Sequence, residues 1–112
     1  MNSERFNAYR LNWVFCSFDL PTNTKEERKI ASEFRLLLLK SGFSMFQYSV
    51  YARPSASIEH ANAIINKVIE SLPQKGNVML FRITDKQFEK ILMIFSKVNS
   101  PEKKTWKQLE LF

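Results

Sequence analysis

The chain reads LNWVFCSFDL at residues 11–20, directly before Pro21. An aromatic and β-branched run that a proline interrupts is typical of a strand. Successive side chains of a strand point to opposite faces, and here these faces carry Val14, Cys16 and Phe18 on one side and Trp13, Phe15, Ser17 and Asp19 on the other. Because both faces are largely apolar, both should be covered. The helices of a short chain cover one face readily, so a second copy of the chain is the expected cover for the other.

The composition of the chain suits one globular domain. It has 112 residues, of which 45% are hydrophobic and 25% are charged, close to ordinary globular usage. The formal net charge is +6 at pH 7, and the basic excess is spread evenly over both halves. This balance permits contact with a polyanion such as nucleic acid and favours it mildly.

Rare residue types exclude several classes of function. Cys16 is the only cysteine, which rules out an internal disulfide and a two-cysteine zinc or redox site and suits a reducing, cytoplasmic setting. The only glycines are Gly42 and Gly76, so no glycine-rich nucleotide loop can form. The polar start at residues 1–7 is not expected to be a signal peptide, and no membrane contact is expected because the longest apolar runs are far too short to span a bilayer.

The first helix and the next extended segment follow from local signals. Thr24 and Glu27 have the spacing of a capping box. An apolar stripe behind them predicts a helix at about residues 24–41, which Gly42 is well placed to end. Residues 44–53 are predicted to be extended, either as one alternating strand or as two short strands with a bulge.

The second half of the chain repeats this alternation. Ser57 is expected to cap a helix that runs to residue 72, before Pro73. Residues 78–84 are predicted to form a strand, and residues 84–87 have the composition of a further helix start. Residues 91–95 suit a helix or a strand, and periodicity does not decide between them.

The order β-α-β(β)-α-β predicts an α+β, ferredoxin-like sandwich, with two helices on one face of an antiparallel sheet. The expected domain spans residues 1–96, and residues 97–112 are expected to be a tail with a short strand at 108–112. The face without helices would expose these apolar side chains: Trp13, Phe15, Met45, Tyr51, Val78 and Leu80. A soluble monomer rarely exposes that much apolar surface, so we expect a homodimer joined through this face.

Asp19 is the most informative acidic residue, because it ends the first strand on the face opposite the helices. Mg²⁺ takes one or two carboxylates and keeps several waters, so one aspartate holds it poorly. A two-fold axis could bring two copies of Asp19 together, in a two-carboxylate site suited to phosphodiester hydrolysis. Alternatively, Asp19 only accepts backbone N–H bonds in the following turn. Asp85, His60 and Cys16 suit structural roles, as a helix cap, a solvent-facing side chain and a core residue.

Other candidate residues surround this strand end. The candidate interface residues are Trp13, Phe15, Ser17, Gln47, Ser49 and Tyr51. The polar members of that set suit either a ligand or contacts across the interface. The candidate nucleic-acid contacts are Lys25, Arg28, Lys29 and Arg53, because cations meet backbone phosphates. For each of these cations, a solvated rim is an equally good explanation.

Several stretches of the chain resemble the Cas2 family, the smaller of the two core proteins of CRISPR spacer acquisition. The resemblance rests on FDLPT at 18–22, ERK at 27–29, GF at 42–43 and QYSVY at 47–51, and it is strongest to the type II branch. It implies a ferredoxin-like homodimer with two facing copies of Asp19, which would be the catalytic residue and the ligand of Mg²⁺. It also implies that the strand at 108–112 adds to the partner subunit's sheet or contacts the integrase.

The resemblance implies a role in antiviral defence as well. A Cas2-family dimer bridges two dimers of the CRISPR integrase, Cas1, and holds a duplex DNA prespacer while new spacers are acquired. Family members are also described as Mg²⁺-dependent endoribonucleases or DNases, so RNA is a second expected substrate. Leu20-Pro21 departs from many relatives, which have Ile and a small residue after the acid. The alternative is a ferredoxin-like RNA-binding or regulatory module without nuclease activity, which would need its uncovered sheet face open to solvent.

Overall fold

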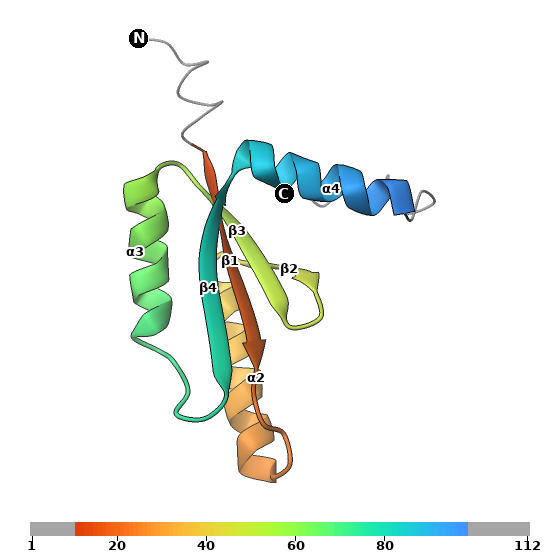
Figure 1. The fold of residues 1–112 in the computed structure, drawn as a ribbon. Coiled ribbons are helices and arrows are strands. Elements are labelled where there is room, and N and C mark those ends of the chain that lie inside the picture. Colours follow the sequence, from red (N-terminus) through yellow and green to blue (C-terminus); the bar gives the residue numbers. More distant parts are fainter. Residues whose placement is uncertain (1–10, 99–112) are drawn as a thin grey trace.

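The computed structural model describes residues 11–98, which form a four-stranded antiparallel sheet and three helices (Figure 1). In chain order the elements are β1 (Asn12–Asp19), α2 (Lys25–Lys40), β2 (Ser44–Gln47), β3 (Val50–Ser55), α3 (Ile58–Ile69), β4 (Asn77–Thr84) and α4 (Asp85–Val98). The strand order is β2-β3-β1-β4, with every neighbouring pair antiparallel. This is the topology of a ferredoxin-like fold, so the predicted fold class is confirmed.

The helices begin where the sequence predicts. The Thr24 hydroxyl accepts the Glu27 N–H at 3.0 Å, and the Glu27 carboxylate accepts the Thr24 N–H at 3.1 Å, which completes the capping box. Ser57 caps α3 by accepting the His60 N–H at 3.0 Å. After α2, Gly42 has a φ of 93°, a left-handed conformation that glycine adopts without strain.

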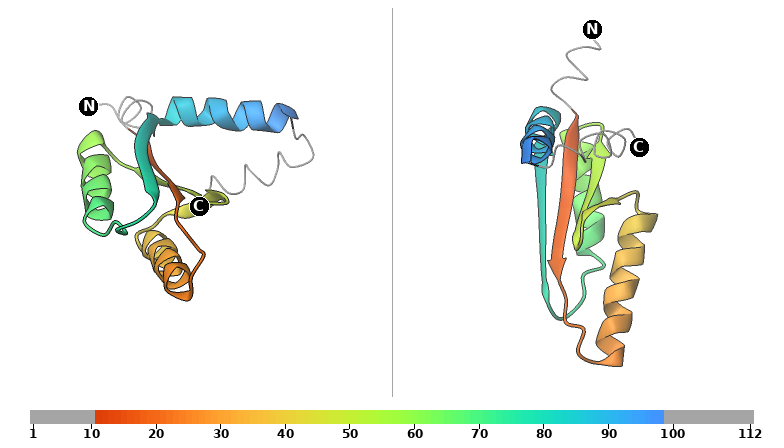
Figure 2. Two further views of the ribbon diagram at one scale, coloured as in Figure 1. Left: turned by 60° about the horizontal axis from the view of Figure 1, so that its bottom comes forward. Right: turned by 90° about the vertical axis from the view of Figure 1, so that its right-hand side faces the viewer.

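One face of the sheet packs against α2 and α3 and holds the larger core. Its buried residues are Val14, Cys16, Phe34, Leu38, Phe43, Tyr51, Ala61, Ile64 and Val68. We call this the covered face. Figure 2 shows α2 and α3 together on this side of the sheet and α4 on the opposite side.

Residues 44–53 form two strands joined by a turn at Tyr48 and Ser49, which changes the predicted faces. Ser49 has a φ of 66°, and the β2–β3 pairing shifts register between Met45 and Gln47. The turn and this bulge interrupt the alternation, so Met45 pairs with Tyr51 on the covered face. Tyr51 is only 1% exposed and lies in the core. The prediction that Met45 and Tyr51 lie on the uncovered face is therefore wrong.

The faces of β4 also differ from the prediction. Leu80 pairs with Cys16 and Val78 pairs with Phe18, and residues paired across antiparallel strands share a face. Val78 and Leu80 therefore pack against the covered core, and not on the face without α2 and α3. The apolar side chains of β4 on the opposite face are Met79, Phe81 and Ile83, which pair with Ser17, Phe15 and Trp13.

The opposite face is partly closed by α4, which the sequence did not predict to lie there. Phe88 stacks on Trp13 with ring centroids 4.0 Å apart, and it lies within 6.1 Å of the Phe15 ring centroid and 5.9 Å of that of Phe46. The indole N–H of Trp13 donates to Asp85 at the start of α4, at 2.8 Å. One end of this face is thus buried within a single chain, and only the other end stays open. We call this open part, which includes Ser17, Gln47, Met79 and Phe81, the uncovered end.

The C-terminal predictions meet the limit of the described residues. Residues 91–95, which suited a helix or a strand, lie in α4, and the expected domain boundary at residue 96 falls inside this helix. The predicted strand at 108–112 lies outside the described residues. Within residues 11–98, no helix is both long and apolar enough to cross a membrane.

Candidate functional site

Asp19 is the exposed last residue of β1, at the end of the sheet that lies away from α4 (Figure 1). Its partner on β4 is Asn77, so a carboxylate and a side-chain amide share one face at this end of the sheet. Gly76 has a φ of 98°, and a Cβ there would lie 2.8 Å from the Asp19 carbonyl oxygen and 2.7 Å from a methyl carbon of Leu20. The loop before β4 therefore packs directly on the backbone that carries Asp19.

A cleft of about 570 Å³ opens beside Asp19, between the end of β1, α2 and the β2–β3 turn. Its polar lining includes Asp19, Arg28, Ser32, Arg35, Tyr48 and Ser49. The Phe18 N–H donates to the Ser49 carbonyl at 3.0 Å, which ties the hairpin turn to the strand end. The structure thus brings four predicted site residues to one cleft, from β1, α2, the β2–β3 turn and β3: Asp19, Arg28, Ser49 and Tyr51.

Three of the predicted nucleic-acid contacts gather near this cleft. Lys25, Arg28 and Lys29 are exposed on the first turns of α2. Arg28 donates through Nη1 to the carbonyl oxygens of Thr22 and Asn23, at 3.2 and 3.4 Å. These bonds hold the guanidinium over the β1–α2 loop and leave its other N–H donors available to an anion.

Arg53 lies apart from that group, at the far end of α2. Its half-buried guanidinium donates to the Ser41 carbonyl and packs beside Gly42. It lines a separate hollow of about 230 Å³ together with His60 and Lys67. Within one chain, Arg53 supports the end of a helix and does not join the cations near Asp19.

The predicted interface residues of β1 lie on the expected face, but two of them already have a cover. Trp13 and Phe15 contact Phe88 of α4. Ser17 is half-buried between Val50 and Met79 on the neighbouring strands.

The three candidates of the β2–β3 hairpin have separate environments. Gln47 is exposed at the end of β2 and pairs with Val50, on the same face as Ser17. Ser49 lies in the turn and lines the cleft, and Tyr51 lies in the covered core. Of the six predicted interface residues, only Ser17 and Gln47 therefore lie on the uncovered end.

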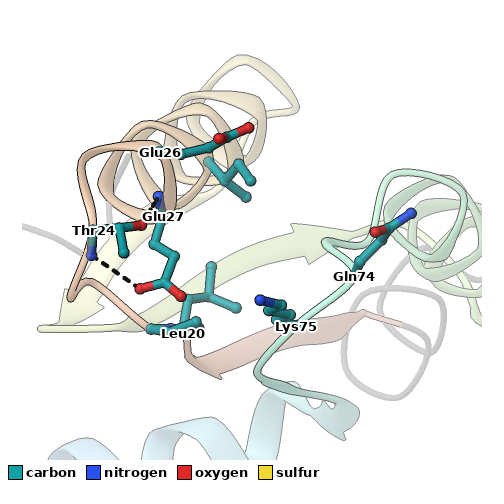
Figure 3. Close-up of a pocket in the computed structure, with 8 residues that line it drawn as sticks. Leu20, Thr24, Glu26, Glu27, Gln74 and Lys75 are labelled. Atoms are coloured by element: carbon teal, nitrogen blue, oxygen red, sulfur yellow. Dashed lines mark hydrogen bonds between the residues drawn. The ribbon is translucent and has the colours of Figure 1, made fainter.

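A smaller hollow of about 360 Å³ lies where the start of α2 meets the loop before β4 (Figure 3). Glu27 and Lys75 both line it. The Glu27 carboxylate already accepts the N–H groups of Asn23 and Thr24, at 2.9 and 3.1 Å. A carboxylate used in this way stabilises the helix start, so we assign this hollow to the support of α2 and not to catalysis.

The other residues capable of chemistry have structural roles. Burial raises the pKa of the Cys16 thiol to about 12, so the thiol stays protonated at neutral pH and is a poor nucleophile. His60 Nδ1 accepts the Ala56 N–H at 3.2 Å beside the start of α3, and Asp85 accepts the Trp13 indole N–H. Among residues 11–98, no group of three His, Cys, Asp or Glu side chains could hold a metal ion. Among the described residues that line the cleft, Asp19 is the only one with a carboxylate.

The whole sheet matches a known protein family. A family model described as "CRISPR associated protein Cas2" covers residues 12–91, from the start of β1 into α4. The chain belongs to the Cas2 family. The protein named CRISPR-associated endoribonuclease Cas2 of Flavobacterium psychrophilum is 48% identical over 108 residues, which are 96% of this chain and 94% of that relative. The equally named protein of Parvibaculum lavamentivorans is 43% identical over 100 residues, or 89% of this chain and 99% of the relative.

The donor atoms around Asp19 of this Cas2-family chain suit a hard cation in kind but not in number. Asp19 offers a carboxylate, and Asn77 beside it offers an amide oxygen. Mg²⁺ prefers such oxygen ligands and is usually held by one or two carboxylates. Since no other described residue that lines the cleft carries a carboxylate, two facing copies of Asp19 would suit the ion better than one.

Sequence reasoning missed several residues of the cleft, among them Arg35 and Tyr48. Arg35 follows Arg28 by seven residues, a spacing that returns to the same helix face after two turns. This signal was available in the sequence. Tyr48 gave no such signal, because its position at the tip of a turn depends on how β2 and β3 pair.

Proposed function

We propose that this Cas2-family chain is a CRISPR adaptation protein that acts as a homodimer, binds duplex DNA and bridges two dimers of the CRISPR integrase. The observation that carries this proposal is the uncovered end of the sheet, where Met79 is 59% exposed and Phe81 is 38% exposed. A second copy that packs here around a two-fold axis would remove this apolar surface from water. The same axis would bring two copies of Asp19 close together at the end of the sheet.

The dimer is tested with two matched substitutions. Met79→Asp puts a charge on the uncovered end, and Ile69→Asp puts the same charge on α3, where Ile69 is 49% exposed. We expect light scattering at micromolar concentration to report a dimer for the wild type and for Ile69→Asp, and a single chain for Met79→Asp. Circular dichroism should report the same fold for all three. A monomeric wild type, or a dimeric Met79→Asp variant, would contradict the proposal.

Duplex binding is supported by the cations Lys25, Arg28 and Lys29 near the cleft. In a two-fold dimer each group would occur twice, and phosphate contacts hold a duplex without reading its sequence. We expect the double substitution Lys25→Gln, Lys29→Gln to weaken duplex binding and to lower the slope of log K against log salt by about one per lost contact. Lys67→Gln on α3 is the matched control. Binding that prefers one sequence, or that ignores ionic strength, would argue against this role.

Symmetry supports the proposed bridging role, because a two-fold dimer would present each of its surfaces twice. Mixing the chain with the integrase of its own CRISPR locus should give a complex of one Cas2 dimer with two integrase dimers, measured by light scattering. Met79→Asp should bind at most one integrase dimer per chain and should not form the larger complex. A large complex formed equally well by this variant would overturn the bridging model.

Mg²⁺-dependent cleavage of nucleic acid is a second candidate function, favoured by the printed name of the relatives, endoribonuclease, and by the position of Asp19. Two copies of Asp19 would hold the ion, which when bound polarises a phosphodiester and activates water. Arg28, beside the same cleft, would position the phosphate. Asp19→Ala should abolish cleavage of labelled RNA and DNA, whereas Glu33→Gln on α2 should not. Equal cleavage by Asp19→Ala, or cleavage that survives removal of Mg²⁺, would exclude this function.

The alternative of an RNA-binding module that stacks bases on its open sheet has little support. Such modules need free aromatic rings on the sheet. Trp13, Phe15 and Phe46 are in ring contact with Phe88 of α4. Phe81 is stacked on Phe15, with centroids 5.1 Å apart.

A further inference from the structure

We propose that the cleft beside Asp19 binds one unpaired nucleotide, whose flanking phosphates contact Arg28 and Arg35 and whose base stacks on Tyr48. This inference rests on the proposed function, since it takes nucleic acid as the ligand. It adds a site that discriminates an unpaired strand from a duplex. Arg35 and Tyr48 would be its specificity-determining residues.

The wall of the cleft formed by α2 is shaped for a ligand with two anionic groups. Arg28, Ala31, Ser32 and Arg35 all line the cleft, and their spacing of three, four and seven residues puts them on one helix face. The small residues in the middle leave room. The arginines stand two turns apart, about 10 Å along the helix axis, with the hollow between them.

Both arginines have donors available for phosphate. Arg28 uses only Nη1, in its bonds to two loop carbonyls. The guanidinium of Arg35 is exposed and makes no hydrogen bond or ion pair with any group that the structure describes. Asp19 lines the same cleft but forms no ion pair with either arginine within the described residues. Guanidinium groups bind phosphate oxygens in a bidentate way, so the remaining donors of Arg28 and the guanidinium of Arg35 favour an anionic ligand.

The opposite wall presents an aromatic ring that nothing in the described chain uses. Tyr48 is 89% exposed at the tip of the β2–β3 turn, and it makes no ring contact among the described residues. The position of its turn is fixed, because the neighbouring Ser49 carbonyl accepts the Phe18 N–H at 3.0 Å. An exposed ring on an anchored turn is a suitable platform for a base, since every nucleobase has a π-face.

The size of the cleft favours a single nucleotide over a duplex. Its volume of about 570 Å³ lies within the range of small-ligand sites, about 300–1,000 Å³. In a duplex the bases are paired and stacked, so they cannot reach Tyr48, whereas an unpaired base can. A nucleotide held here would have its phosphodiester beside Asp19, which lines the same cleft.

The test measures the binding of short single strands by fluorescence anisotropy. The probes are labelled hexamers of uridine and of deoxyuridine, and a mixed-sequence duplex serves for comparison. We expect Tyr48→Ala to weaken hexamer binding about tenfold, as loss of one stacked base does, and Tyr48→Phe to bind as the wild type does. Duplex binding by Tyr48→Ala should stay within about twofold of wild type. Tighter binding of uridine than of deoxyuridine would identify RNA as the preferred strand, because only the 2′-hydroxyl distinguishes the two.

The arginine is tested with Arg35→Gln, and Lys40→Gln in the last turn of the same helix is the matched control. Arg35→Gln should weaken hexamer binding about tenfold and reduce its salt dependence, whereas Lys40→Gln should do neither. If the wild type does not bind the hexamers, or if Tyr48→Ala and Arg35→Gln bind them as tightly as the wild type, the cleft is not a nucleotide site. A wild type that fails to bind the duplex would overturn the proposed function instead, and the hexamer result would still decide the cleft.

Discussion

The two faces of the sheet are made of similar apolar strands. Within a single chain, helices cover one face, whereas they cover only one end of the other. On the covered face, Val14 and Cys16 are fully buried under α2 and α3. On the opposite face, α4 buries Phe15 at one end, while Met79 stays 59% exposed at the other. The apolar character of a strand therefore does not tell which of its faces is core and which is contact surface. The difference lies in how far the helices reach.

The first prediction concerns a substitution in the core of the covered face. Tyr51 lies 1% exposed among Cys16, Phe18 and the helices. Tyr51→Ala removes a large buried ring, and should lower the free energy of unfolding by about 3–5 kcal/mol. Chemical denaturation measures this, with Tyr51→Phe as the control that keeps the ring. A wild-type denaturation midpoint combined with loss of the dimer would show that Tyr51 belongs to the dimer interface and not to the core.

The second prediction opens the end of the other face that α4 closes. Phe88→Ala removes the ring that stacks on Trp13 at 4.0 Å and should destabilise the chain by about 3 kcal/mol. Measured in a Trp106→Phe background, the fluorescence of Trp13 should shift to longer wavelength as its ring becomes wetter. Ile91→Ala, one turn further along α4 at an exposed position, should change neither quantity by a comparable amount. An unchanged Trp13 emission would show that α4 does not cover this end in solution.

The third prediction concerns the end of β1, where Asp19 lies. Gly76→Ala combines a φ of 98° with a Cβ only 2.8 Å from the backbone oxygen of Asp19, and should cost about 1–3 kcal/mol of stability. Gly42→Ala is the comparison, because its Cβ would meet the flexible Arg53 guanidinium at 3.2 Å, and it should cost less. Thermal unfolding of both variants ranks the two positions. The reverse ranking would mean that the loop before β4 does not fix the strand end.

The smallest predicted effect is at the start of α2, which carries the cations near the cleft. Thr24→Ala removes the hydroxyl that accepts the Glu27 N–H and should cost about 1 kcal/mol. Thr22→Ala, at an exposed loop position without a capping role, should be neutral. Equal midpoints for the two variants would show that the capping box adds no stability.

Much of the fold could be predicted from local patterns. The capping box at Thr24 and Glu27, the Ser57 cap and the position of Gly42 depend only on neighbouring residues, and the structure confirms all three. The candidate site was predicted in part. Asp19 and Arg28 line one cleft, but Arg53 is used at the end of α2. The sequence could not separate these cations, because a charge pattern does not tell which carbonyl a guanidinium reaches.

The sequence by itself determined where α2 and α3 begin, the acid at the end of β1 and the even basic charge, because caps and strand ends depend on neighbouring residues and a charge count needs no structure. Only the tertiary structure decided which face each strand of the second half presents. Both alternating sets of β4 are apolar, Val78 and Leu80 against Met79 and Phe81, so their faces follow from pairing with Cys16 and Ser17 of β1. Tyr51 was decided by the bulge and turn before it. Register is a long-range property, and a shift of one residue moves a side chain from core to surface.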